Sequence, residues 1–200
     1  MSWQSEIDEL QRRKDLGRQM GGPEGIERQH SRGKLTVRER IDKLVDPESF
    51  SEFGPLVGTA RYDGNELASF TPKGAVEGVC KLGGRKVILT GGDFTISGGS
   101  GGSGGGLGSE LPSNQRALQW RMPYVRLLDA AGGSVRSFEQ IGRTYLPDGN
   151  VWTAVDVQLL SRVPVVSAVM GSVAGLPAIN ACLAHFNIMV KGISQLFPGG

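Results

Sequence analysis

The stretch Val125-Arg-Leu-Leu-Asp-Ala-Ala-Gly-Gly-Ser-Val-Arg136 decides how the fold is interpreted. Residues 122–128 form a mostly apolar run, rich in valine and leucine, which predicts a buried strand. The run stops at Asp129, and two alanines and two glycines follow. In open α/β sheets, ligands bind beyond the carboxyl ends of the strands. The residues just after this strand are therefore the first candidates for a functional site.

Gly132 and Gly133 could form such a site with backbone atoms alone. Glycine has no Cβ, so it turns tightly and lets a ligand approach the main chain. The N–H groups of both glycines, and that of Ser134, could then point at an oxygen that becomes negative during a reaction. The alternative is an ordinary turn at the end of a strand. On this stretch alone, the ordinary turn is the simpler interpretation.

The same pattern occurs again later in the chain. Residues 163–170 predict a second buried strand, which we expect to end at Gly171. A glycine turn at 171–175 follows, and Leu176-Pro177 opens a helix that runs through Leu183. The N-terminus of a helix offers unpaired N–H groups and the positive end of the helix dipole. Two glycine turns could thus converge on one oxygen.

Working outward, the chain alternates between strand and helix patterns. This alternation predicts an α/β protein. Strands are predicted over 56–62, 75–81, 86–90, 91–96, 122–128, 163–170, 186–190 and 193–197. Helices are predicted over 3–20, 36–45, 112–121, 151–162 and 176–183.

The N-terminal region is helical and rich in charge. Trp3, Ile7 and Leu10 lie at helical spacing, so residues 3–20 predict an amphipathic helix that ends at Gly21-Gly22-Pro23. A polar, basic stretch follows at 27–34. Thr36 and Glu39 then fit a capping box that opens a short helix. The basic residues of this region are either a solvated face or contacts for the phosphates of a nucleotide-bearing ligand.

The glycine-rich tract at 97–109 predicts a flexible linker, with a mobile loop over a ligand site as the alternative. It contains a formal G-x-G-x-x-G at Gly99, Gly101 and Gly104. A tract this rich in glycine contains the pattern by chance, so the match carries little information. The acidic residue that a dinucleotide site needs about twenty positions later is also missing, because Asp129 comes too late. We therefore reject a dinucleotide-binding motif.

Composition excludes several classes of protein. The chain has 200 residues, 38% hydrophobic and 21% charged, and a formal net charge of +2, so it is globular and gives no reason to expect nucleic acid. The sequence shows neither a secretory signal nor an apolar run long enough to span a membrane, so we expect a cytoplasmic protein. Cys80 and Cys182 are predicted to be buried, and with His30 and His185 they do not make a zinc set. A Ser–His–acid or Cys–His centre stays open.

Several segments, in order along the chain, resemble the carboxyltransferase (β) subunits of biotin-dependent acyl-CoA carboxylases of the propionyl-CoA and acetyl-CoA carboxylase type. The segments are 29–41, 46–50, 91–100, 128–136 and 162–175. The resemblance implies a crotonase-like (ClpP/crotonase) α/β fold, a spiral of ββα units. It implies an N-terminal helical segment at 1–50 and a crotonase-like carboxyltransferase N-terminal domain at 51–200, incomplete at its C-terminus.

The resemblance implies a reaction. A carboxyl group would move from carboxybiotin to the α-carbon of an acyl-CoA thioester, through an enolate held by backbone oxyanion donors. No metal is needed. The implied catalytic positions are Gly132, Gly133, Ala174 and Gly175. The implied substrate-binding positions are Gly99, Ser100, Ser134 and Gly171.

It also implies partners. The sequence has no Met-Lys-Met biotinylation site, so biotin would be carried on a separate biotin carboxylase or carrier subunit. The family pattern further implies a homo-oligomer, a hexamer in the family type.

The sequence departs from the family pattern in three places. It reads Asp-Ala-Ala-Gly-Gly-Ser where better-known members read Asp-Ser-Gly-Gly-Ala, and Leu176 stands where a second glycine is common. The chain ends at Gly200, where family members continue into a second crotonase-like half. Two alternatives follow: a non-catalytic assembly piece that keeps the CoA side, or another crotonase-type enzyme such as a hydratase or decarboxylase. The latter would need Glu139 as its acid or base.

Overall fold

The fold is known from a computed structural model that describes residues 3–99, 112–132, 139, 142 and 153–198. Its helices are α1 (Gln4–Arg18), α2 (Gly22–His30), α3 (Val37–Leu44), α4 (Ser113–Trp120), α7 (Ala154–Leu160) and α8 (Leu176–Cys182), with a 3₁₀ turn at Ser97–Gly99. Its strands are β1 (Ser51–Glu52), β2 (Gly58–Asp63), β3 (Glu66–Pro72), β4 (Ala75–Leu82), β5 (Arg85–Gly92), β6 (Tyr124–Ala130), β7 (Val165–Ala174), β8 (Phe186–Met189) and β9 (Gln195–Phe197).

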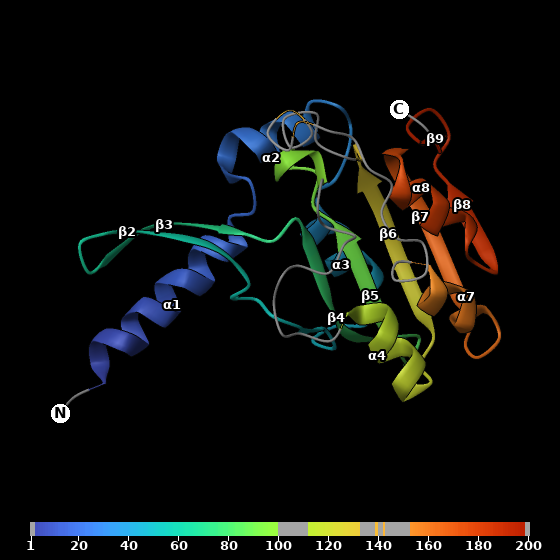
Figure 1. Cartoon of the computed structure of the whole chain (residues 1–200), viewed down its shortest axis with the longest axis horizontal. Helices are drawn as coiled ribbons and strands as arrows, with labels where there is room; N and C mark the ends of the chain where they lie inside the picture. The colour runs from blue at the N-terminus through green and yellow to red at the C-terminus, as the bar shows by residue number, and fades with distance from the viewer. Residues whose placement is uncertain (1–2, 100–111, 133–138, 140–141, 143–152, 199–200) are drawn as a thin grey trace.

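A mixed sheet forms the centre of the molecule (Figure 1). Its strand order is β1-β4-β5-β6-β7-β8, and β9 also pairs with β7. The pairs β1–β4 and β4–β5 are antiparallel, whereas β5–β6, β6–β7, β7–β8 and β7–β9 are parallel. Parallel neighbours require crossover connections. Strands β6 and β7 therefore end at the same edge, where the two glycine turns were predicted to meet.

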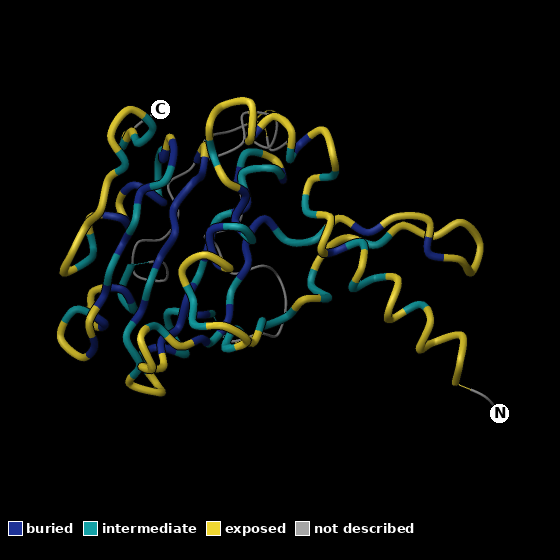
Figure 2. Tube along the Cα trace, turned by 180° about the vertical axis from the view of Figure 1, so that it is seen from behind, coloured by how far each residue is buried: buried dark blue, intermediate teal, exposed yellow. Residues whose placement is uncertain are grey.

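Helices cover both faces of the sheet. On one face, Val37 and Ile41 of α3 pack against Cys80, Leu89 and Leu127. On the other face, α4, α7 and α8 pack over β5, β6 and β7, with side chains from two core clusters. Because α3 belongs to the main core, the packing continues across residue 50, where the sequence suggests a boundary between two segments. Figure 2 shows the buried residues concentrated along these strands.

Helix α1 and the β2–β3 hairpin extend away from this body (Figures 1 and 2). Phe70 of β3 is buried, and its ring would lie 3.5 Å from a Cβ on Gly17 of α1. The expected apolar side of α1 is left uncovered beyond that contact, since Trp3 is 72% exposed and Ile7 is 55% exposed. The helix is confirmed, but its amphipathic pattern does not correspond to burial.

The local motifs are largely confirmed. Thr36 and Glu39 form the capping box at the start of α3, with both reciprocal bonds present. The hairpin β4–β5 turns at Gly83 and Gly84, both of which have positive φ. The hairpin β2–β3 turns at Gly64, which also has positive φ. Cys80 is buried, and burial raises the pKa of its thiol to about 11.

Several boundaries were wrong. Strand β6 continues through Asp129 to Ala130, and β7 continues through Gly171 to Ala174, so neither strand stops where the apolar run stops. The expected strand at 91–96 ends at Gly92. Cys182 is exposed. Residues 22–30 form helix α2, which was not predicted because this stretch is rich in glycine and charged residues.

Edge strand β8 closes the sheet, and all four of its residues are exposed. Phe186 is 63% exposed and Met189 is 53% exposed. Within the part of the chain that the structure describes, none of the helices is both long enough and apolar enough to cross a membrane.

Candidate active site

The two glycine turns meet at the carboxyl ends of β6 and β7. Ala130 pairs with Val173, so Gly132 and Ala174 follow side by side. A Cβ built on Gly132 would lie 2.9 Å from the carbonyl oxygen of Ala174. A Cβ built on Gly175 would lie 3.8 Å from the Cα of Gly132. Gly132, Ala174 and Gly175 are therefore neighbours, and the convergence of the two turns on one oxygen stays a prediction.

Backbone conformation explains why both positions are glycine. Gly132 has a φ of +85° and Gly175 has a φ of +67°. L-residues with a side chain rarely adopt this region of φ. At Gly132, crowding by Ala174 adds to the conformational requirement. Among the described residues, the two turns contact each other through main-chain atoms and the methyl group of Ala174.

The N–H groups at this point are unequal. The N–H of Gly175 donates to the carbonyl of Phe197 at 2.9 Å, so it is already used inside the protein. Pro177 has no N–H, and the N–H groups of Ala178 and Ile179 both donate to the carbonyl of Gly175. Leu176 lies between Gly175 and Pro177 in the sequence. Among the described residues, its N–H has no backbone acceptor.

Asp129 lies below the first turn and is fully buried. Its Oδ1 accepts a hydrogen bond from Nζ of Lys34 at 2.9 Å. Its Oδ2 accepts from a terminal nitrogen of Arg40 at 2.8 Å and from Nε2 of Gln29 at 3.3 Å. Lys34 also lies over the ring of Phe94, 4.5 Å from its centroid. A buried carboxylate needs such partners, because losing its hydration would otherwise be very costly.

Gly171 and Gly99 contact this aspartate from opposite sides. A Cβ on Gly171 would lie 2.1 Å from Oδ1 of Asp129 and 2.6 Å from Nζ of Lys34. A Cβ on Gly99 would lie 2.5 Å from the carbonyl oxygen of Asp129. Both glycines were predicted to bind substrate. In the structure, the Asp129 carboxylate and Lys34 fill the space at Gly171, and residues 129 and 130 fill the space at Gly99, which accounts for glycine at both positions.

The other predicted site residues are placed as follows. Gly133, Ser134 and Ser100 lie outside the described residues. Glu139, the candidate acid or base of the alternative enzyme, is exposed.

A second buried ion pair holds helix α8, which begins at the second turn. Arg126 of β6 donates to the carbonyls of Asn180 and Leu183 at the end of α8. Its guanidinium lies 3.4 Å from Oδ1 of Asp156 on α7, and both side chains are at least 96% buried. Burial raises the pKa of Asp156, and the charge of Arg126 opposes this. The pair links β6, α7 and α8 on the opposite side of the sheet from α3.

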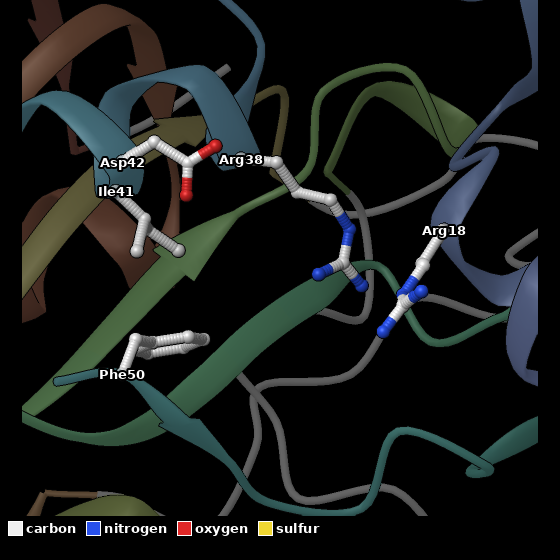
Figure 3. Close-up of a pocket in the computed structure, with 5 residues that line it drawn as sticks. All are labelled: Arg18, Arg38, Ile41, Asp42 and Phe50. Atoms are coloured by element: carbon white, nitrogen blue, oxygen red, sulfur yellow. The ribbon is translucent and has the colours of Figure 1, made fainter. Parts of the chain in front are cut away.

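The two arginines of α3 are used within the protein, whereas Lys43 is exposed. Arg40 contacts Asp129, and Arg38 makes a two-bond ion pair with Glu52 at 2.9 and 3.1 Å. Figure 3 shows Arg38 at a pocket with Arg18, lined also by Ile41, Asp42 and Phe50, where the two guanidinium groups point toward each other. Glu52 offsets the charge of Arg38. The alternative to a solvated face, contact with the phosphates of a ligand, stays untested.

Sequence reasoning missed the Asp129 cluster. The signal was present, because an aspartate directly continued an apolar run and would be buried if the strand continued. The identity of its partners was not readable, since Lys34 and Arg40 lie far upstream in the sequence.

Comparison with known proteins identifies the family. The model of the carboxyl transferase domain matches residues 28–200. The propionyl-CoA carboxylase beta chain of Roseobacter denitrificans is 32% identical over 97% of this chain and 37% of its own length. The methylmalonyl-CoA decarboxylase subunit alpha of Veillonella parvula is 31% identical over 90% of this chain and 35% of its own length.

A solved structure shows the same fold. The crystal structure of transcarboxylase 12S, described as a hexamer assembly with substrate binding, matches with a TM-score of 0.78 and 27% identity, covering 100% of this chain and 38% of that one. The predicted crotonase-like α/β carboxyltransferase fold is thereby confirmed. The chain spans 35–38% of the length of each of these relatives.

Proposed function

Because the chain belongs to the carboxyl transferase domain family, whose model matches residues 28–200, we propose that it forms the acyl-CoA side of a biotin-dependent carboxyltransferase. The reaction transfers a carboxyl group to the α-carbon of an acyl-CoA thioester. The observation that supports this most directly is the meeting of Gly132 with Ala174 and Gly175 at the carboxyl ends of two parallel strands. Among the described residues, the atoms nearest to the two glycines at this point belong to the main chain and to the small side chain of Ala174.

The chemistry requires a place for negative charge. When the α-proton leaves the thioester, charge develops on the carbonyl oxygen of the resulting enolate. Preorganised backbone donors stabilise such an oxygen in a site that excludes water. We assign this role to the turn at Gly132 and Gly133 and to the backbone around Ala174 and Gly175. Since the N–H of Gly175 donates to Phe197, Gly175 contributes its bare Cα and its conformation.

The proposed contacts with the rest of the substrate divide into two kinds. Ser100 and Ser134 remain proposed substrate contacts. Gly99 and Gly171 are proposed to act indirectly, because both pack against Asp129. Their role is to let the strand that carries the first turn lie where it does.

Biotin, carried on a separate protein, would supply the carboxyl group and accept the α-proton in exchange. We assign none of the described residues to biotin, so the proposal for this chain concerns only the acyl-CoA side. The relative crystallised as a hexamer suggests a hexameric homo-oligomer here. The proposed partners are thus an acyl-CoA, a biotin-carrying subunit and further copies of the chain.

A second candidate function is decarboxylation, the reverse loss of a carboxyl group from a carboxyacyl-CoA. The relative named methylmalonyl-CoA decarboxylase subunit alpha, 31% identical, is the observation that favours it. The same enolate and the same backbone donors would serve either direction. A non-catalytic assembly piece would need neither.

The test uses the complete natural protein that contains this chain. Loss of the carboxyl group from malonyl-CoA or methylmalonyl-CoA is measured with and without biocytin, a soluble mimic of the carried biotin. We expect turnover that requires biocytin. Turnover without it favours a biotin-independent decarboxylase, and no turnover under either condition favours the assembly piece.

A matched pair of variants places the activity at the turn. Gly132→Ala introduces a side chain at a position with positive φ that is also crowded by Ala174. Gly64→Ala introduces the same side chain at positive φ at the tip of the β2–β3 hairpin, where nothing lies within 4 Å. Losing one oxyanion donor typically costs about 100-fold or more in rate. Alanine keeps its backbone N–H, but its methyl group must displace the turn and its donors, so we expect a loss of this size for Gly132→Ala and near-normal turnover for Gly64→Ala. Equal activity of the two variants would remove Gly132 from the site.

A further inference from the structure

We propose that Lys34 and Arg40 are positioning residues, which fix the glycine turn after β6 by holding the side chain of Asp129. We call these three residues, with Gln29, the Asp129 clamp. The clamp itself is independent of the reaction, and only its effect on acyl-CoA binding rests on the proposed function.

The first argument is burial. The side chain of Asp129 is 0% exposed, that of Arg40 is 4% exposed and that of Lys34 is 9% exposed. Removing one partner from such a group leaves a buried charge without compensation. The position of the aspartate is therefore determined by where its two cations lie.

The second argument is the irregularity of the sheet at this point. Leu128 pairs with Val169, but Ala130 pairs with Val173, so β7 contains two extra residues opposite Asp129. Gly171 lies within that extra length and contacts the Asp129 carboxylate. Bulges of this kind re-aim the chain next to functional sites. Here the bulge makes room for the clamp.

The third argument is the short path from Asp129 to the turn. Its carbonyl oxygen would lie 2.8 Å from a Cβ on Gly92 and 2.5 Å from one on Gly99. Two residues later, the N–H of Ala131 donates to the carbonyl of Gly98 at 2.7 Å. Gly132 follows directly. With its side chain and its main chain both fixed, Asp129 transmits its position to Gly132 through three peptide units.

The fourth argument is the origin of the donors. All three come from residues 29–40, before the first strand of the sheet. Helix α3, which carries Arg40, is itself fixed by the capping box and by Val37 and Ile41 in the core. The N-terminal segment therefore acts as a rigid support for the turn that follows β6.

The experiment compares two arginines of the same helix. Arg40→Met removes a donor to Asp129, and Arg38→Met removes the same charge from a pair with Glu52. Amide hydrogen exchange is measured in the complete protein for a peptide covering 128–132, with a peptide from the β4–β5 hairpin as internal reference. We expect exchange in 128–132 at least tenfold faster in Arg40→Met than in Arg38→Met, with the reference peptide matched.

General destabilisation gives a different result, because it speeds exchange in both peptides. Equal exchange of 128–132 in the two variants, or a change shared by the reference peptide, would overturn the proposal. If Arg40→Met does not fold, Lys34→Met tests the same point at the other oxygen of Asp129, against the same control.

A second readout separates the clamp from the proposed function. Affinity for propionyl-CoA is measured by calorimetry, and we expect at least fivefold weaker binding by Arg40→Met and unchanged binding by Arg38→Met. If the unmodified protein does not bind propionyl-CoA while the selective change in exchange is observed, the clamp stands and the proposed function fails. If propionyl-CoA binds equally to all three proteins while the selective change in exchange is observed, the clamp stands and its predicted effect on acyl-CoA binding is overturned.

Discussion

Oδ1 of Asp129 occupies the place where Gly171 would carry a side chain, 2.1 Å from an ideal Cβ at that position. The two residues lie on neighbouring parallel strands, and Lys34 reaches into the same space. The aspartate, its cation and the glycine thus form one packing unit, in which none can change size alone.

Gly171→Ala should therefore destabilise the fold. The added methyl group must displace either the Asp129 carboxylate or the backbone of β7, and overpacking of this kind costs about 1–3 kcal/mol, with more when a buried ion pair is disturbed. We expect a loss of at least about 2 kcal/mol in urea unfolding. Ser172→Ala, at the exposed neighbouring position, is the control and should change stability by less than about 0.5 kcal/mol. Similar effects of the two substitutions would contradict the packing unit.

Thr36→Ala should weaken the start of α3. The hydroxyl of Thr36 accepts a hydrogen bond from the N–H of Glu39 and donates to its carboxylate. Loss of an N-cap side chain typically costs about 1 kcal/mol. The measurement is the free energy of unfolding in urea, compared with Ser69→Ala on the exposed face of β3. A cost below about 0.3 kcal/mol would mean that packing alone fixes the helix start.

Glu39 should give the protein a small acid-labile contribution to stability. Its hydrogen bond with His30, followed by that from the N–H of Thr36, lowers the pKa of Glu39 from 4.5 to about 2. Since the folded pKa is depressed, this contribution is complete above pH 4.5 and is lost as the pH falls toward 2. Glu39 is partly exposed, so screening by solvent keeps the effect small.

The check is the difference in unfolding free energy between the unmodified protein and Glu39→Gln. This difference should be at its full size at pH 5 and shrink steadily as the pH falls from 4.5 toward 2. A difference that grows on acidification would show that the sign is wrong.

Asp156→Ala should strongly destabilise the packing of α7 and α8 against β6. It leaves the Arg126 guanidinium buried without its carboxylate, and breaking a buried pair costs about 3–5 kcal/mol. Glu52→Ala is the comparison, because it breaks the part-exposed pair with Arg38 and should cost less than about 1 kcal/mol. Both values come from urea unfolding, and a cost for Asp156→Ala no larger than that of its comparison would count against this account of the pair.

Much of the fold could be predicted from the sequence, because its signals are local. The hairpin β4–β5 follows from alternation around Gly83-Gly84, and α3 follows from Thr36 and Glu39. The convergence of Gly132 with Gly175 could be anticipated because both follow strands that read as buried and parallel, and parallel strands end at one edge.

The rest depended on contacts between distant residues. The end of β6 was misplaced because an aspartate ordinarily ends a buried strand, whereas Asp129 is kept inside by two cations from far upstream. Gly171 was read as a turn for the same reason, since a glycine inside a strand is explained only by what lies against it. The exposed apolar residues of α1 could not be distinguished from buried ones by their spacing.

Strand β8 has a practical consequence for anyone who produces these residues. It ends the sheet with Phe186, Ile188 and Met189 exposed, and its outer edge offers unpaired peptide groups among the described residues. Such an edge is a template on which another polypeptide can add a strand. In concentrated solution the chain by itself should therefore self-associate. Light scattering that rises with protein concentration would detect this association first.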